Sequence, residues 1–330
     1  MPLMPGYIAF NSPFRAAWWL PGPHCQTVWP ALMRRRRSQV RVQRLELPDG
    51  DFLDLAWNRG EQGPLVLIIH GLEGSVESHY VPGLLSECAQ RGWRAALVHL
   101  RGCSGEHNRL ARRYHAGETG DIEFVVRTLR GTYPGVPIAA VGFSLGGNML
   151  LKWLGETGRD TPLAAAVAVS VPFELEASVR ALERGLGRVY QAYLLRALKR
   201  STLDKFSCRA APFDMAALKR VRTIFEFDDR VTAPLHGFDG ARDYYRRMSC
   251  RQYLHGIAAP TLIVQAADDP MVPAATIPGH AELSNTTRLE LARSGGHVGF
   301  VASRFPARPV YFLEQRIPDF LGAHLAGGNR

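Results

Sequence analysis

The chain has 330 residues, of which 46% are hydrophobic and 21% are charged, so it is long and apolar enough to bury a sizeable core. It has no uninterrupted apolar run of 18 or more residues and no basic segment leading into an apolar one at its start, so we expect neither a membrane-spanning helix nor a secretory signal. Its five cysteines show no CxxC spacing, which argues against a disulfide framework or a zinc site and favours reduced thiols in a cytoplasmic protein.

The net charge of +10 is concentrated near the N-terminus. Residues 1–44 contain seven arginines, no lysine and no acidic residue, whereas the remainder, with 33 basic and 30 acidic residues, carries only +3. The densest part is Arg34-Arg35-Arg36-Arg37. This run fits either a solvated basic surface or a weak peripheral contact with an anionic membrane. No helix-turn-helix, zinc-finger or RNP pattern occurs, so we expect no nucleic-acid partner.

Residues 1–44 are rich in proline, tryptophan and arginine and lack a clear periodicity, so we expect an N-terminal arm that packs aromatic side chains on the core. Two strands should follow, at 42–47 and 52–57, because Pro48-Asp49-Gly50-Asp51 between them is typical of a hairpin turn.

Strand and helix patterns then alternate, which predicts a mostly parallel sheet with helices on both faces, formed by residues 45–171 and 257–330. The strand pattern fades over 172–256, where helical, Arg- and Tyr-rich sequence predicts a lid inserted over the carboxyl edge of the sheet. The expected strands are 65–69, 94–100, 137–141, 163–169, 260–265 and, last, 288–291, and the expected helices include 80–91, 119–129, 148–154, 189–199, 242–248 and 310–321.

Gly142-Phe143-Ser144-Leu145-Gly146 joins an expected buried strand to an expected helix. Glycine and serine are common, so GxSxG alone could be an ordinary strand-to-helix turn. In this setting, however, the motif resembles the nucleophile elbow of α/β-hydrolases, where small neighbours allow a strained serine to project above the sheet. The sequence therefore favours Ser144 as a nucleophile.

A nucleophilic serine needs a base and a carboxylate that orients the base, in the order Ser, acid, His along this fold. Asp268 and Asp269 both follow an apolar strand, and both are candidates for the acid. We favour Asp269, because Asp-x-x-Val-Pro is how the acid turn usually runs in this fold, and expect Asp268 to be a turn residue. His297, in a loop with two preceding glycines after the last expected strand of the sheet, is the candidate base.

His70-Gly71-Leu72-Glu73-Gly74 follows the expected central strand, where an α/β-hydrolase places its second oxyanion donor. We therefore expect the backbone N–H groups of Leu72 and Leu145 to form the oxyanion hole. His70 should support this loop rather than transfer a proton, and Glu73 should be solvated rather than line the site.

Several motifs in one order resemble the YheT-like branch of the α/β-hydrolases, related to the ABHD1/ABHD3 type, across nearly the whole chain. The resemblance implies a serine carboxylesterase acting on short- or medium-chain acyl esters or lipid esters. An HxxxxD motif discussed for acyltransferases among such relatives is not matched, because the fifth residue after His115 is Gly120 and Asp121 comes one position late. The matching segments are Pro23-His24-x-Gln26-Thr27-x-Trp29-Pro30, His70-Gly71-Leu72-Glu73-Gly74-Ser75, Arg101-Gly102-Cys103-Ser104-Gly105, Tyr114-His115-Ala116-Gly117-Glu118-Thr119 and Gly142-Phe143-Ser144-Leu145-Gly146-Gly147-Asn148, with the turns of Asp269 and His297.

The resulting prediction is a serine hydrolase that cleaves esters through an acyl-enzyme, using Ser144, His297 and Asp269 and needing no metal or organic cofactor. Two alternatives stay open from sequence. An alcohol acyltransferase could use the same three residues, and a non-catalytic binding protein could retain the fold.

Overall fold

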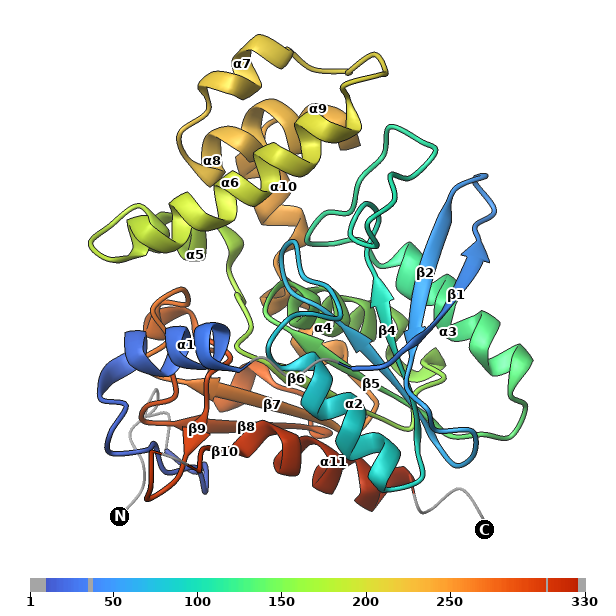
Figure 1. Cartoon of the computed structure of the whole chain (residues 1–330), viewed down its shortest axis with the longest axis vertical. Coiled ribbons are helices and arrows are strands. Elements are labelled where there is room, and N and C mark those ends of the chain that lie inside the picture. The colour runs from blue at the N-terminus through green and yellow to red at the C-terminus, as the bar shows by residue number, and fades with distance from the viewer. Residues whose placement is uncertain (1–9, 35–37, 307, 326–330) are drawn as a thin grey trace.

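The central sheet has eight strands in the order β1-β2-β4-β3-β5-β6-β7-β8 in the computed structural model, which describes residues 10–34, 38–306 and 308–325 (Figure 1). The hairpin β1–β2 and the pair β2–β4 are antiparallel, and every later pairing is parallel. The predicted mostly parallel sheet is therefore confirmed. The strands are β1 (Arg41–Glu46), β2 (Phe52–Trp57), β3 (Leu65–Ile69), β4 (Arg94–His99), β5 (Ile138–Phe143), β6 (Ala165–Val169), β7 (Thr261–Ala266) and β8 (Thr287–Ala292).

The central parallel strands β3, β5 and β6 are fully apolar because helices bury the sheet from both sides. Side chains from one face pack against α3 (Gly120–Thr132) and α4 (Leu145–Thr157). Side chains from the other face pack against α2 (Val81–Gln90) and α11 (Phe312–Leu325). Burial on both faces removes the usual apolar–polar alternation, which is why these strands appear in the sequence as continuous hydrophobic runs.

The parallel register brings the loops that matter to one edge of the sheet. Ile69 of β3 pairs with Gly142 of β5, and Gly142 pairs with Ala168 of β6, so these three strands end side by side. The strands β7 and β8 continue the same sheet and end at Ala266 and Ala292. Loops that follow parallel strands therefore meet at this carboxyl edge, where α/β folds bind ligands.

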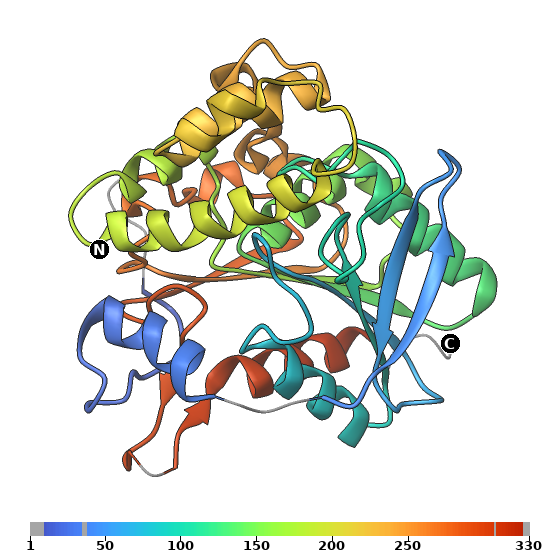
Figure 2. The same ribbon diagram turned by 45° about the horizontal axis from the view of Figure 1, so that its top comes forward.

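Between β6 and β7 the chain is helical and lies over the carboxyl edge of the sheet (Figures 1 and 2). These helices have a hydrophobic core of their own, to which the loop residues Leu72 and Leu145 of the sheet edge also contribute contacts. The segment comprises α5 (Leu175–Leu182), α6 (Gly187–Lys205), α7 (Met215–Arg220), α8 (Ile224–Phe227), a π-helical turn (Asp228–Thr232), α9 (Ala233–His236), α10 (Ala241–Met248) and a 3₁₀ stretch (Cys250–Gly256).

Two parts of the chain differ from the prediction. The N-terminal arm contains a helix, α1 (Gly22–Met33), which the sequence conceals because Pro23 and Pro30 both occur within it and it has no charged residue to mark a polar face. The strand β8 is not the last, because β9 (Val301–Ala302) and β10 (Val310–Tyr311) form a separate antiparallel pair before α11. Gln26 of α1 bonds both the N–H and the carbonyl of Val301, so α1 is attached to this hairpin.

Residues 1–9 and Arg35 to Arg37 of the predicted arm lie outside the described residues. None of the helices in the described part of the chain combines the length and hydropathy that crossing a membrane requires.

Candidate active site

Ser144 lies in the tight turn between β5 and α4. Its φ of 51° and ψ of −118° place a non-glycine residue in a strained conformation, as expected at a nucleophile elbow. A Cβ on Gly142 would lie 2.4 Å from the carbonyl oxygen of Gly146, and a Cβ on Gly146 would lie 2.4 Å from that of Ile69. Only glycine fits at either position, because strand, turn and helix approach each other to backbone contact.

Three of the predicted site residues form a chain of hydrogen bonds. The Nε2 atom of His297 lies 2.9 Å from Ser144 Oγ, and its Nδ1 atom lies 2.8 Å from Asp269 Oδ2. Asp269 is buried, and its other carboxylate oxygen accepts the N–H of Met271 at 2.9 Å. With the proton on Nδ1 bonded to Asp269, His297 presents a lone pair to the Ser144 hydroxyl, which is the arrangement that a general base requires.

The loop of His297 is fixed by side chains from three other segments. Thr27 Oγ1 accepts the backbone N–H of His297 at 2.9 Å, and Ser170 Oγ accepts that of Val298 at 2.9 Å. Asp268 Oδ1 accepts the N–H of Gly296 at 3.0 Å. Asp268 is thus bonded to backbone in this turn, while Asp269 faces the imidazole.

Two backbone N–H groups lie beside Ser144 and lack an acceptor among the described residues. Leu145 is the first residue of α4, so its N–H has no partner within the helix and lies at the positive end of the helix dipole. Leu72 lies in the loop after β3, next to Gly71, and a Cβ on Gly71 would lie 3.2 Å from Ser144 Cβ. Both leucines line the pocket that contains Ser144.

The loop that carries Leu72 is anchored on both sides. Tyr80 Oη accepts the N–H of Gly71 at 3.0 Å, and Tyr114 Oη accepts the N–H of Glu73 at 2.8 Å. His70 is buried, with Nδ1 2.7 Å from the Gly71 carbonyl and Nε2 accepting the N–H of Leu100 at 3.1 Å. Burial lowers the pKa of His70 to about 4, so it is a neutral support of this loop.

The expectation that Glu73 is solvated is wrong. Its carboxylate is largely buried, pairs with the Arg113 guanidinium at 2.8 Å and accepts the Tyr114 hydroxyl at 2.8 Å. The φ of 51° at Glu73 turns the chain there, and the buried ion pair holds that strained turn. The sequence could not show this, because Arg113 is 40 residues away and is brought to Glu73 only by the fold.

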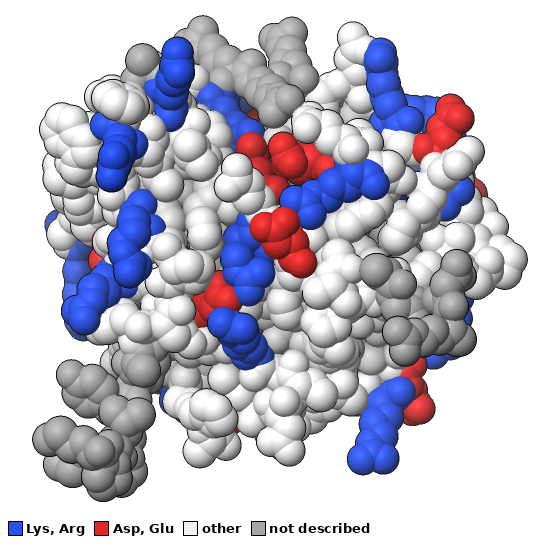
Figure 3. All heavy atoms as spheres, turned by 90° about the horizontal axis from the view of Figure 1, so that it is seen from below, with Lys and Arg blue, Asp and Glu red and all other residues white. Residues whose placement is uncertain are grey.

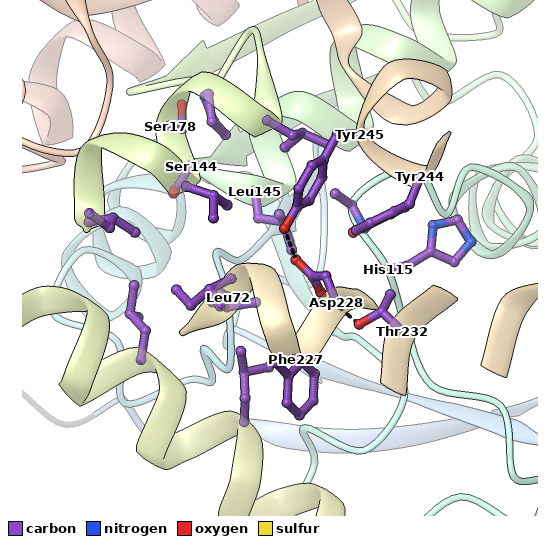
Figure 4. Close-up of a pocket in the computed structure, with 18 of the residues that line it drawn as sticks. Leu72, His115, Ser144, Leu145, Ser178, Phe227, Asp228, Thr232, Tyr244 and Tyr245 are labelled. Atoms are coloured by element: carbon purple, nitrogen blue, oxygen red, sulfur yellow. Dashed lines mark hydrogen bonds between the residues drawn. The ribbon is translucent and has the colours of Figure 1, made fainter. Parts of the chain in front are cut away.

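A pocket with an empty volume of about 950 Å³, part of it open to solvent, leads from Ser144 into the helical segment (Figure 4). Its walls are mainly aliphatic and aromatic side chains, which makes it suitable for a hydrocarbon chain. The apolar lining includes Leu175, Val179, Leu194, Leu198, Ile224 and Phe227.

The pocket also has a polar region that the sequence did not indicate. Asp228 Oδ2 accepts the Tyr245 hydroxyl at 2.6 Å and Oδ1 accepts the Thr232 hydroxyl at 2.7 Å, as the dashed lines in Figure 4 show. Burial raises the pKa of Asp228 to about 6. In the sequence, an aspartate within helical segments is indistinguishable from a solvated one, and no motif marked this one.

His115 lies at the same pocket and is not bonded to Asp121. Its ring packs edge-on against that of His236, and burial lowers the pKa of each imidazole to about 3, so both are neutral near pH 7. Asp121 instead makes two bonds of 2.7 Å to the buried Arg101 guanidinium. His115 and Asp121, the two residues compared with the HxxxxD motif, therefore take part in separate interactions.

Residues 64–302 match the family model described as alpha/beta hydrolase fold. The chain is 46% identical to "Putative esterase YheT" of Escherichia coli (strain K12), over 92% of this chain and 91% of that protein. It is 30% identical to "Phospholipase ABHD3" of Mus musculus, over 91% of this chain and 75% of that protein. A solved structure of the Pyrococcus furiosus esterase Pf2001 superposes with a TM-score of 0.59 at 17% identity, covering 97% of this chain and all of that one, and so shares the fold.

Proposed function

This chain belongs to the alpha/beta hydrolase fold family and is of its esterase and lipase type, and from that premise we propose that it hydrolyses carboxylic esters through an acyl-enzyme on Ser144. The observation that supports the proposal is the continuous hydrogen-bonded chain from Ser144 through His297 to Asp269 at the mouth of an apolar pocket. In this proposal these three residues are the catalytic triad.

In the acylation step, Ser144 Oγ attacks the ester carbonyl carbon while its proton passes to His297 Nε2. The carbonyl oxygen becomes an oxyanion, which accepts hydrogen bonds from the N–H groups of Leu72 and Leu145. Asp269 stabilises the imidazolium through the bond to Nδ1. The tetrahedral adduct then expels the alcohol, which takes the proton from Nε2, and Ser144 is left esterified.

In the deacylation step, His297 Nε2 takes a proton from a water molecule as its oxygen attacks the acyl carbon. A second oxyanion forms in the same hole. Collapse of this adduct breaks the bond to Ser144 Oγ, which recovers its proton from Nε2. The products are the carboxylic acid and the free enzyme, so neither step consumes a cofactor.

We further propose that residues 172–256 form a lid that shapes the acyl site, and that the N-terminal arm supports the base through Thr27. The apolar lining of the pocket matches a short- or medium-chain acyl group or a lipid chain. The phospholipase among the relatives is consistent with a lipid ester as substrate.

The test is Ser144→Ala assayed with p-nitrophenyl esters of increasing chain length. Loss of the nucleophile should reduce kcat by at least ~10⁴-fold and abolish labelling by a fluorophosphonate, with an unchanged circular dichroism spectrum. Substantial turnover by the folded variant would refute the assignment of Ser144. Absence of labelling in the wild type would point to a binding protein, and ester products formed with an added alcohol would point to acyl transfer.

A further inference from the structure

Exposed large apolar side chains are concentrated on two helices. Among the described residues twelve such side chains are exposed, and six of them lie on α1 or at the start of α6. These helices make up about a tenth of the chain, so the concentration is not the ordinary scatter of single apolar residues over a surface. The six are Val28, Leu32 and Met33 on α1, and Leu186, Val189 and Tyr193 at α6, and we call their surface the α1–α6 face.

Helical periodicity and one contact make the two sets continuous. Along α1, His24, Val28 and Leu32 recur every four residues and therefore share a face. Along α6, Leu186, Val189, Tyr190 and Tyr193 fall on one stripe for the same reason. His24 Nδ1 lies 2.8 Å from Tyr190 Oη and the two rings are stacked, so the two apolar stripes meet at this pair. Figures 1 and 2 both show α1 beside the start of α6.

The charged residues of α6 nearest this face are mostly basic. Between Glu183 and Asp204 the sequence has four arginines, one lysine and no acidic residue. Arg184, Arg188 and Arg196 are exposed and form no ion pair with any described acidic side chain. The helix α1 has no charge of its own. Figure 3 views the molecule from below, where basic side chains lie mainly toward the left and acidic ones gather near the centre and the right.

The α1–α6 face adjoins the candidate active site. Thr27 of α1 holds the backbone of His297, and Leu194 and Leu198 of α6 line the pocket of Ser144. The same two helices thus carry pocket or site contacts on one side and exposed apolar side chains on the other. A molecule bound at this face would lie next to the pocket.

We propose that the α1–α6 face docks on the surface of an anionic lipid bilayer. Exposed apolar side chains with unpaired arginines nearby match the two components of such a surface, the acyl boundary and the negative headgroups. A second copy of the chain is a poorer occupant. A two-fold contact would place Arg184, Arg188 and Arg196 of one copy close to the same arginines of the other, and like charges repel. The proposal goes beyond ester hydrolysis. It also concerns a different surface from the basic run at 34–37, most of which lies outside the described residues.

The experiment measures sedimentation of Ser144→Ala protein with vesicles, so that hydrolysis does not alter the lipid. Vesicles contain either phosphatidylcholine alone or equal parts of phosphatidylcholine and phosphatidylglycerol. Leu32→Gln, Val189→Gln and Tyr193→Gln are combined to remove apolar side chains, and Arg184→Gln and Arg196→Gln are combined to remove charge. The matched controls are Val42→Gln with Leu110→Gln, and Arg130→Gln with Arg159→Gln, which are exposed positions on other surfaces.

We expect binding to the anionic vesicles that weakens with salt, and weaker binding to the neutral ones. The apolar variant should lose at least about tenfold in partitioning, and the double arginine variant about fivefold for each charge, while both controls bind as the parent does. Negligible binding to anionic vesicles would overturn the proposal, as would equal loss in the controls or no loss in the variants. A concentration-dependent dimer, seen by light scattering and abolished by the apolar variant, would instead assign the face to a second copy. Because binding is scored without turnover, none of these results bears on whether Ser144 is the nucleophile.

Discussion

Replacing Asp269 by Asn should disable the enzyme far more than replacing its neighbour Asp268. Asp269 uses both carboxylate oxygens, since Oδ1 accepts the N–H of Met271 and Oδ2 faces Nδ1 of His297. An amide has only one acceptor oxygen. In Asp269→Asn, an NH₂ group must therefore oppose either the Met271 N–H or the His297 Nδ1–H.

The magnitude follows from which of these bonds is lost. If the NH₂ group faces His297, the imidazole must carry its proton on Nε2, and it cannot accept the proton of Ser144. Loss of the correct tautomer in a serine triad costs ~10⁴-fold in kcat, which corresponds to about 5.5 kcal/mol of transition-state stabilisation. Asp268 bonds backbone N–H of the glycine turn, and one amide oxygen can replace that acceptor. We therefore expect Asp268→Asn to lose less than about tenfold.

The assay is kcat/KM for p-nitrophenyl butyrate, measured for the wild type and the two isosteric variants at pH 8, with thermal melting to verify that each is folded. Fluorophosphonate labelling rates provide a second readout of Ser144 reactivity that does not depend on deacylation. Equal losses in the two variants, or a larger loss in Asp268→Asn, would show that the orienting carboxylate has been misassigned.

Three further predictions follow. Thr27→Val should lower kcat/KM by about tenfold or more, because it leaves the His297 N–H without an acceptor, whereas Thr27→Ser should restore near-normal rates; a Ser variant as slow as the Val variant would contradict this role. Gly146→Ala should prevent stable folding, since its Cβ would lie 2.4 Å from the Ile69 carbonyl, while Gly131→Ala, with open space around it in α3, should raise the melting temperature slightly; similar melting of both would be inconsistent with the elbow geometry. The pKa of Asp228 is raised to about 6 in the folded protein, so folding favours the protonated carboxyl. As pH rises from about 4 through about 6, the free energy of unfolding of the wild type should therefore fall by up to about 3 kcal/mol relative to that of Asp228→Asn. Parallel pH profiles in urea unfolding would exclude that coupling.

The sequence by itself determined the architecture and the identity of the elbow. The apolar runs of β3, β5 and β6 predict buried parallel strands, because only a sheet covered on both faces makes such runs stable. Gly142 and Gly146 predict the turn around Ser144, because steric contact at a strand-to-helix crossing is a local property of adjacent residues. The order of Ser144, Asp269 and His297 along the chain matches this fold, and the structure brings the three together.

Only the tertiary structure decided how that site is supported and what it faces. Thr27 reaches His297 across 270 positions of sequence, and Arg113 reaches Glu73 across 40, so neither pairing leaves a local pattern. The helix α1 has no recognisable helical pattern in the sequence, because it contains two prolines and no charged residue, and it is attached to β9 by the hydrogen bonds of Gln26. Nothing in the sequence around Asp228 indicates that it lines a pocket, where α10 brings the Tyr245 hydroxyl within hydrogen-bond distance of it. Local steric contacts and periodicity depend on neighbouring residues and can be recognised in the sequence. Burial and long-range hydrogen bonds depend on which distant segments the fold brings into contact.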